Sequence, residues 1–185
     1  GGGRGGAAPG GLRGRAVTGL LASLLAAALA VWPMLAPRPP PPLEGPVDPI
    51  IVDKGDRTLR LMDDGRVLRT YAVGLGFEPV GAKERRGDGR TPEGLFRIDR
   101  RNDASRFHLS LGLDYPRPED VARARAGGYA PGGDIFIHGQ PNALGLPPRA
   151  RIAGDWTEGC IALADANMEE VWSVAPLGTP VEVRP

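Results

Sequence analysis

The feature that most constrains the fold is a repeated pattern from residue 48 onward, in which short apolar runs alternate with turns rich in Gly and Asp. Runs this short, with partial alternation of apolar and polar residues, are typical of β-strands that bury one face. Asp64 and Gly65 separate two such runs and suit the type I′ turn of a hairpin. The predicted strands cover residues 50–53, 58–62, 66–73, 95–98, 135–137 and 181–183.

Two short helices are expected among these strands. Pro118 can begin one helix over residues 118–125, because the first helical turn tolerates proline. Asp165 is expected to cap the other helix, over residues 166–174. The core face of that second helix consists of Met168, Val171 and Trp172. The predicted fold class is therefore mainly β, a sandwich or a partly open barrel with two short helices at its edges.

The N-terminal part of the chain has the charge order of an export signal. Residues 1–15 are rich in glycine and arginine and are predicted to be disordered. Residues 16–36 form an apolar stretch that indicates either a cleaved signal peptide or an uncleaved membrane anchor. A stiff Pro-rich linker over residues 37–47 follows, and residues 48–185 suffice for one compact domain. We therefore expect an exported protein, in the periplasm or elsewhere in the cell envelope, attached to the inner membrane if the anchor stays uncleaved.

Composition argues against several classes of function. The formal net charge is +1 and aromatic residues make up 5% of the chain, which does not favour nucleic-acid binding. Two histidines and one cysteine lack the spacing of a zinc site, so neither a metal nor another cofactor is predicted. A run of basic residues between positions 83 and 101 is interpreted as a solvated loop rather than a path for an anionic polymer.

The single cysteine, Cys160, is the best candidate for chemistry. A lone thiol is a buried apolar residue, an intermolecular bridge or a nucleophile. His138 favours the third interpretation, because a histidine can take the thiol proton or hold the thiolate as imidazolium. It follows the apolar run at 135–137, and Gly139 beside it is expected to leave space for a substrate.

The residues before Cys160 suit an oxyanion hole. Gly159 lets the backbone turn sharply, so the amides of Glu158, Gly159 and Cys160 are expected to point toward one spot. Such converging N–H groups would stabilise a tetrahedral intermediate formed on the sulfur.

These motifs resemble the L,D-transpeptidase catalytic domains of bacterial cell-wall enzymes, the YkuD family, over roughly residues 49–185. His138-Gly139 and the block from Thr157 to Cys160 carry the resemblance, with three of the block's four positions matching. Further matching stretches are residues 87–94, 108–111 and 178–183. His108 is interpreted as a structural or substrate-lining residue, and the resemblance implies that the stretch around it lies near the substrate. Thr157 and Trp156 are further candidate substrate contacts, with a core position as the alternative for Trp156.

The resemblance implies a reaction on peptidoglycan stem peptides. Cys160 would attack the carbonyl before the terminal D-alanine of a tetrapeptide and form a thioester, with His138 as base and then acid. The Gly139 carbonyl would orient the ring of His138. An amine acceptor would complete transpeptidation, and water would instead make the enzyme an L,D-carboxypeptidase. A non-catalytic wall-binding module is the third alternative.

Two positions depart from the family pattern. Glu158 stands where the family has histidine, and Ala162 stands where arginine is common. A carboxylate beside the nucleophile opposes thiolate formation, and the missing arginine removes one way to bind a substrate carboxylate. Residues 140–154, which are rich in Pro, Gly and Arg, are predicted to form either a lid over the site or an inert surface connection.

Overall fold

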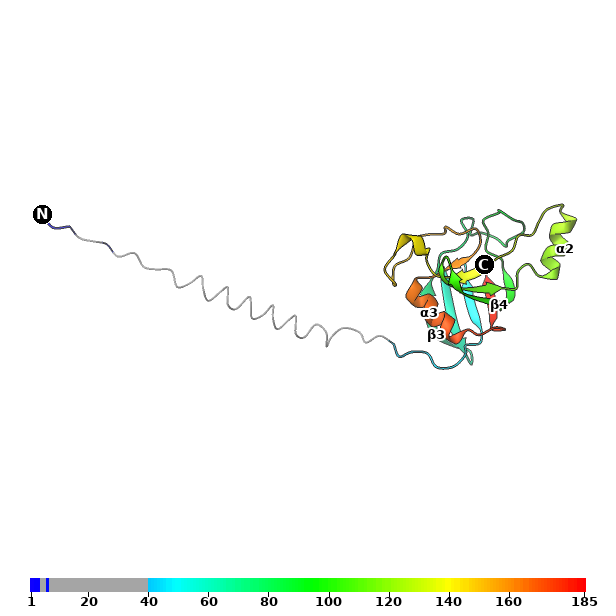
Figure 1. Ribbon diagram of the computed structural model, residues 1–185, viewed down its shortest axis with the longest axis horizontal. Helices are drawn as coiled ribbons and strands as arrows, with labels where there is room; N and C mark the ends of the chain where they lie inside the picture. Colours follow the sequence, from blue (N-terminus) through cyan, green and yellow to red (C-terminus); the bar gives the residue numbers. More distant parts are fainter. Residues whose placement is uncertain (4–5, 7–39) are drawn as a thin grey trace. The chain divides into compact units, whose positions relative to one another are not determined.

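The computed structural model of the protein describes residues 1–3, 6 and 40–185 (Figure 1). The chain divides into two units, Gly1–Pro41 and Pro42–Pro185, and the second unit contains every strand and helix that the described residues form. The predicted signal peptide or anchor at 16–36 lies outside the described residues, as do most of the glycine-rich segment and the first part of the linker. Within the described ranges, no helix combines the length and apolar character needed to span a bilayer.

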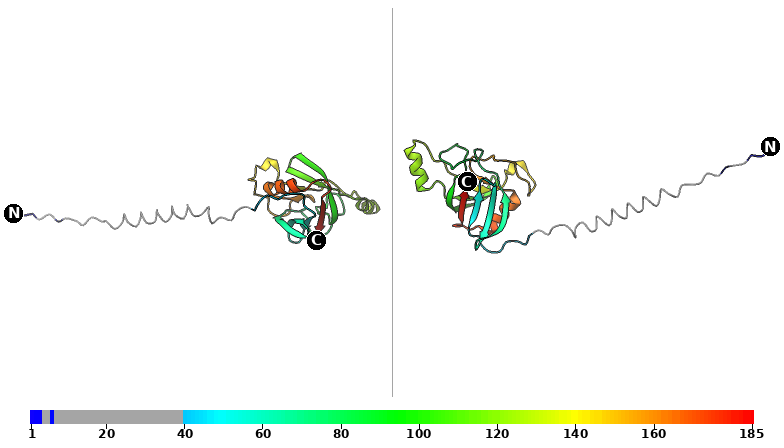
Figure 2. Two further views of the ribbon diagram at one scale, coloured as in Figure 1. Left: turned by 90° about the horizontal axis from the view of Figure 1, so that it is seen from below. Right: turned by 180° about the vertical axis from the view of Figure 1, so that it is seen from behind.

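Eight strands in residues 40–185 form one curled sheet in the order β3-β2-β1-β8-β4-β5-β6-β7 (Figure 2). Their bounds are β1 Ile50–Asp53, β2 Thr58–Asp63, β3 Arg66–Ala72, β4 Gly94–Ser105, β5 His108–Leu113, β6 Phe136–His138, β7 Ile161–Ala162 and β8 Pro180–Arg184. The prediction of a mainly β fold with two short helices is confirmed. Of the two predicted arrangements, the curled sheet corresponds to the partly open barrel, not to a two-sheet sandwich.

The first three strands pair as an antiparallel meander. In the turn between β2 and β3, Asp64 has φ 45° and Gly65 has φ 74°, and two positive values are what the predicted type I′ turn requires. β8 then joins β1 in parallel, so the end of the domain pairs with its beginning. This half of the sheet is therefore built from local hairpins plus one long-range pairing.

The long strand β4 connects the two halves of the sheet. Its first part pairs with β8 and its second part with β5, with a register shift between Ile98 and Arg100. β6 runs antiparallel to β5 and parallel to β7, which sets His138 opposite Ala162. Two of these strands, β5 and β7, were not predicted. The reason for β5 is that it carries polar residues such as Ser110, and the reason for β7 is that it has only two residues.

Two α-helices lie within residues 40–185, α2 Pro118–Ala126 and α3 Asp165–Val174, together with a short 3₁₀ turn, η1 Asn142–Leu144. The predicted core face of α3 is confirmed for Met168 and Val171, which are fully buried. Trp172 is only partly buried, and the guanidinium of Arg101 lies 3.8 Å from the centre of its ring.

The predicted cap of α3 is wrong. Ala164 is the N-cap residue, and Asp165 is already the first residue of the helix. The Asp165 carboxylate instead accepts a hydrogen bond from the Gln140 amide at 2.7 Å. A side chain expected to close a helix end therefore fixes the chain where it leaves β6.

The hydrophobic core lies along the sheet and under α3. Leu59 and Leu61 of β2 are fully buried, as their alternation with polar neighbours predicts. α3 packs against β5 and β6 and contributes Met168 and Val171 to the same core. The short strands that carry the candidate catalytic residues thus rest on a continuous apolar layer.

Candidate active site

Cys160 and His138 line one cavity of about 930 Å³. β6 ends with His138, and Cys160 directly precedes β7, so the parallel pairing of these strands brings together residues that are far apart in the chain. Trp156, Thr157 and Glu158 also line this cavity. The structure therefore gathers most of the predicted site residues around one space.

The ring of His138 is held in a defined tautomer. Its side chain is buried, and its Nδ1 lies 2.7 Å from the carbonyl oxygen of Gly139. Because a carbonyl only accepts hydrogen bonds, Nδ1 carries the proton and Nε2 is left as an acceptor. Rings of Phe107 and Trp156 lie 4.6 and 5.8 Å from the His138 ring, centre to centre. Burial lowers the pKa of His138, and the bond to Gly139 opposes that shift only in part.

Cys160 presents a neutral thiol. Its Sγ accepts a hydrogen bond from the Phe136 amide at 3.4 Å and contacts the Asp134 carbonyl oxygen at 3.5 Å. Burial raises the pKa of the thiol, the Phe136 amide and Lys83 lower it, and the carboxylates of Asp134 and Glu158 raise it again. The net shift is upward, so the thiol is protonated at neutral pH.

No hydrogen bond between Cys160 and His138 is found among the described residues. With the thiol pKa raised and the imidazole pKa lowered, both groups are neutral near pH 7. Of the two predicted roles of the histidine, this arrangement fits a general base that takes the proton during attack. It does not fit a preformed pair of imidazolium and thiolate.

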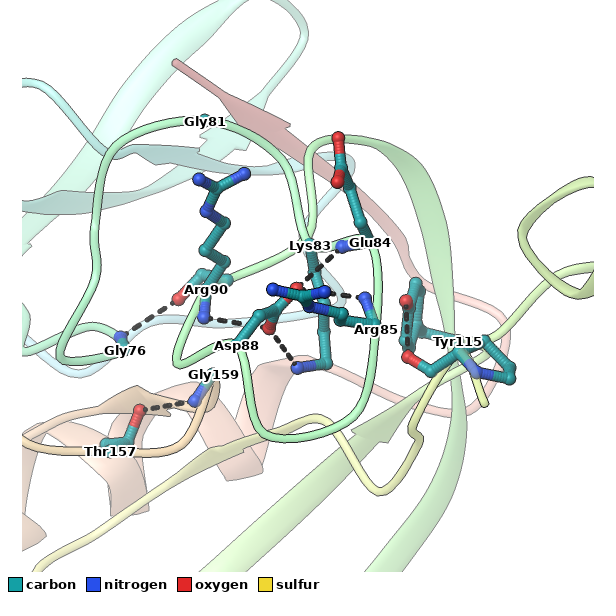
Figure 3. Close-up of polar contacts among 12 residues, drawn as sticks. Gly76, Gly81, Lys83, Glu84, Arg85, Asp88, Arg90, Tyr115, Thr157 and Gly159 are labelled. Carbon is teal, nitrogen blue, oxygen red and sulfur yellow. Dashed lines mark hydrogen bonds and ion pairs between the residues drawn. The ribbon is translucent and has the colours of Figure 1, made fainter. Parts of the chain in front are cut away.

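The turn before Cys160 depends on Gly159. Its φ is 130°, and a Cβ at this position would lie 2.5 Å from the carbonyl oxygen of Arg90. The Thr157 hydroxyl accepts a hydrogen bond from the Gly159 amide at 3.1 Å (Figure 3). The same hydroxyl donates a hydrogen bond to the Cys160 carbonyl at 2.7 Å. This small network sets the conformation of the turn.

The same network reduces the predicted oxyanion hole from three amides to two. Since the Gly159 N–H is bonded to Thr157, it is not free to bind a substrate oxygen. The amides of Glu158 and Cys160 have no hydrogen-bond partner in the described part of the chain. These two N–H groups are the donors available to developing negative charge.

Gly139 does not leave space for a substrate, and that expectation is wrong. A Cβ at Gly139 would lie 2.5 Å from the Asp165 carboxylate and 2.8 Å from the Cβ of His108. The glycine therefore allows close packing between β6, α3 and the β4–β5 turn. The cavity is lined instead by His138 and Cys160, and Gly139 is not among its lining residues.

His108 does not line the cavity, although the resemblance implied it lies near the substrate. It begins β5 with φ 63°, and its Nε2 lies 2.9 Å from the Glu169 carboxylate of α3. Its neighbour Phe107 lines the cavity instead and contacts the ring of His138. A shift of one residue along the β4–β5 turn separates the two roles, and a sequence pattern does not resolve such a shift.

Sequence reasoning also missed several cavity residues with charged side chains. They are Lys83, Arg86, Arg106 and Asp134. Lys83 and Arg86 belong to the basic run that was interpreted as a solvated loop, and the buried Lys83 departs from that interpretation. None of the residues that line the cavity comes from the predicted lid at 140–154, whereas three come from residues 83–87.

The residues of the site do not form a metal centre. In residues 1–3, 6 and 40–185, no three His, Cys, Asp or Glu side chains gather in a way that could hold a metal ion.

Comparison with known proteins agrees with this fold. The sequence profile of YkuD, the L,D-transpeptidase catalytic domain, matches residues 48–183. The chain therefore belongs to the L,D-transpeptidase catalytic domain family.

A curated relative and two solved structures illustrate the family. The Escherichia coli (strain K12) protein named "Putative L,D-transpeptidase YafK" is 24% identical over 129 residues, which are 66% of this chain and 45% of the relative. The helical cell shape determining protein Pgp2 from Campylobacter jejuni is 26% identical, with a TM-score of 0.55 over 76% of this chain and 48% of Pgp2.

The L,D-transpeptidase (Yku) from Stackebrandtia nassauensis shares the fold, at 13% identity and a TM-score of 0.51, over 78% of this chain and 58% of that one. The chain spans about half the length of YafK and of Pgp2. The similarity thus covers only part of each of those longer proteins.

Proposed function

We propose that this protein is a cysteine-dependent L,D-transpeptidase that acts on peptidoglycan stem peptides. The observation that carries the proposal is the shared cavity of Cys160 and His138, together with the amides of Glu158 and Cys160, which have no hydrogen-bond partner among the described residues. Membership of the L,D-transpeptidase catalytic domain family supports the class of enzyme and the class of substrate.

The first half of the reaction forms an acyl-enzyme. His138 Nε2 takes the proton of Cys160, and Sγ attacks the carbonyl that precedes the terminal D-alanine of a tetrapeptide stem. The oxygen of the tetrahedral intermediate accepts hydrogen bonds from the amides of Glu158 and Cys160. The C–N bond then breaks, His138 returns the proton to the departing amine, and a thioester remains on Cys160.

The second half transfers the acyl group. An amine from a neighbouring stem attacks the thioester carbonyl, His138 accepts its proton, and the proton returns to the sulfur as the new amide bond forms. Because the imidazole pKa lies below its usual value, His138 is in the basic form required at neutral pH.

Recognition of the substrate carboxylates is assigned to Arg86 and Arg106. Both side chains line the cavity, and neither guanidinium has a partner among the residues that the structure describes. At the position of the common family arginine, Ala162 is buried and its amide and carbonyl both bond to Gly74. Arginine is suited to carboxylates because it binds them in a two-pronged manner.

The proposed site of action is the cell envelope. The export interpretation of residues 16–36 and the linker at 37–47 support secretion across the inner membrane, with or without retention of an anchor. Similarity to Pgp2, a helical cell shape determining protein, is compatible with a role in maintaining wall geometry.

Mass spectrometry of products tests the proposal. The protein would be incubated with a disaccharide tetrapeptide, in parallel with Cys160→Ala. Cross-linked dimers that require Cys160 are the expected result. Tripeptide alone would convert the assignment to L,D-carboxypeptidase, and unchanged substrate with no thioester adduct would favour the wall-binding module.

A further inference from the structure

A buried cation lies in the wall of the cavity. Lys83, in the loop between β3 and β4, is 4% exposed and lines the cavity together with Cys160. Its Nζ forms an ion pair with the Asp88 carboxylate at 2.7 Å, and both side chains are largely buried. Removing an ammonium group from water is costly, and a buried pair is weak evidence for a stabilising role alone. The position of this cation in the wall of the cavity that Cys160 also lines therefore calls for a functional reason.

Asp88 fixes the loop that carries Lys83. One carboxylate oxygen accepts hydrogen bonds from Lys83 Nζ and the Arg90 amide, and the other accepts from the amides of Glu84 and Arg85 (Figure 3). Burial opposes ionisation of Asp88, but these bonds outweigh it and lower its pKa to about 2. Asp88 is therefore charged at neutral pH and holds the lysine in place.

The loop at 83–90 approaches two segments that adjoin the nucleophile. A Cβ at Gly132 would lie 3.2 Å from Cε of Lys83, so the lysine stem packs against the chain two residues before Asp134. The carbonyl oxygen of Asp134 in turn contacts the sulfur of Cys160. On the other side, the Arg90 carbonyl approaches Gly159 so closely that only a glycine fits.

We propose that Lys83, held by Asp88, is a positioning residue that stabilises negative charge on the sulfur of Cys160 as its proton leaves for His138. The proposal rests on the proposed function only in taking Cys160 as the nucleophile.

The other charged groups around the sulfur define the effect that Lys83 has on ionisation of Cys160. Asp134 and Glu158 line the cavity, and their carboxylates oppose ionisation of Cys160, although the Asp134 carboxylate also pairs with Arg100 at 3.1 Å; His138 is neutral. Lys83 acts in the opposite direction on the thiol pKa. Arg86 and Arg106 also line the cavity, but their side chains belong to exposed residues, where solvent screens their charge more strongly. Lys83 is thus the buried cation available to offset the acidic groups.

The pH dependence of thiol alkylation tests the proposal without requiring turnover. Because Cys160 is the single cysteine, iodoacetamide labelling of the full chain reports this sulfur alone. Rate constants would be measured between about pH 6 and pH 11, a range that extends well above the usual thiol pKa because burial raises the pKa of Cys160. The midpoint is the pH at which the alkylation rate reaches half of its maximum. Lys83→Met should move this midpoint to higher pH by about one unit and slow labelling at neutral pH about tenfold. Lys83→Arg keeps the charge and should stay close to the wild type.

Lys54 offers a matched control. It is also a buried lysine, paired with Glu93 at 2.7 Å, and its Nζ bonds to the Gly81 carbonyl of the same loop. It does not line the cavity. Lys54→Met should therefore lower stability without moving the alkylation midpoint, which separates loss of a loop anchor from loss of a cation near the sulfur.

A double variant addresses the charge that Lys83→Met leaves unpaired. In Lys83→Met/Asp88→Asn the remaining side chain at 88 is neutral, so folding is less compromised. The midpoint should still lie above the wild-type value. A wild-type midpoint in either the single or the double variant would overturn the proposal. If instead the shift is observed but no cross-linking or hydrolysis is ever detected, the proposed function fails while the role of Lys83 in thiol ionisation stands.

Discussion

The two halves of the sheet are built by different means. In β1, β2 and β3, neighbours in sequence pair through short turns, and side chains such as Leu61 are fully buried. In β5, β6 and β7, the pairing that matters joins His138 to Ala162 across a long connection, and the β7 strand has two residues. Both halves bury apolar side chains in the core, but none of the residues that line the cavity comes from β1, β2 or β3. Stability and chemistry should therefore respond to different substitutions.

The largest effect on chemistry is expected from Gly159→Ala. The strained φ and the contact with the Arg90 carbonyl would shift the turn and misalign the neighbouring amides. Since loss of one oxyanion donor costs on the order of a hundredfold, turnover of stem peptides should fall by about that factor or more.

Gly178→Ala is the matched control for Gly159→Ala. Gly178 also has a positive φ, 88°, but a Cβ there would meet nothing within 4 Å. This variant should retain wild-type turnover. An equal loss in both variants would mean that backbone strain in general, not the turn at the nucleophile, limits activity.

Leu61→Ala lies in the half of the sheet formed by β1, β2 and β3, and it should affect stability rather than chemistry. Truncation of a fully buried leucine typically lowers the free energy of unfolding by about 2–5 kcal/mol, because a cavity remains. Chemical denaturation would measure this loss. The alkylation rate of Cys160 in the folded protein should stay unchanged.

Leu95→Ala controls for the change of side chain, because Leu95 in β4 is 69% exposed. It should change the free energy of unfolding by no more than about 0.5 kcal/mol. An altered alkylation rate in Leu61→Ala under folding conditions would break the separation between the two halves.

A smaller effect is expected from Arg106→Gln. Loss of one charge-assisted bond to a substrate carboxylate should raise KM about tenfold, with little change in kcat. Steady-state kinetics with a tetrapeptide donor would measure both. Arg66→Gln, at the exposed β2–β3 turn of the other half, should leave KM unchanged. A fall in kcat alone would contradict a binding role for Arg106.

The smallest effect is expected from Glu158→Gln. The Glu158 carboxylate raises the pKa of Cys160, so its removal lowers that pKa and the thiolate forms at lower pH. Because Glu158 is exposed, screening keeps the gain in alkylation near neutral pH to about twofold. Glu44→Gln, at an exposed position before β1, is the control. Slower alkylation in Glu158→Gln would reverse the sign of this argument.

Local sequence signals predicted the elements that depend on local interactions. The turn at Asp64-Gly65 and the buried alternation of β2 follow from residues within a few positions of one another. The prediction failed for Asp165, whose carboxylate bonds to Gln140 instead of capping α3, and for Gly139, whose missing side chain accommodates α3. Both errors concern partners that lie far away in the sequence.

The candidate site likewise combines features that the local sequence predicts with features that depend on contacts between distant segments. The residue types of Cys160 and His138, and the glycine before the cysteine, were sufficient to single out a thiol site and the family it resembles. The buried Lys83 and the occupied Gly159 amide depend on how the loop at 83–90 folds against the Cys160 turn. No periodicity or motif in a single sequence reports such a contact.

The order of amino acids alone was thus enough to predict a mainly β domain and to select candidate reactive side chains, because turn preferences, apolar alternation and thiol chemistry are local properties. Which amides are free, which cation faces the sulfur and which protonation states His138 and Cys160 adopt depend on the folded chain. Burial and charge at a site are the sum of contributions from distant segments, and those segments meet only when the sheet closes around the cavity.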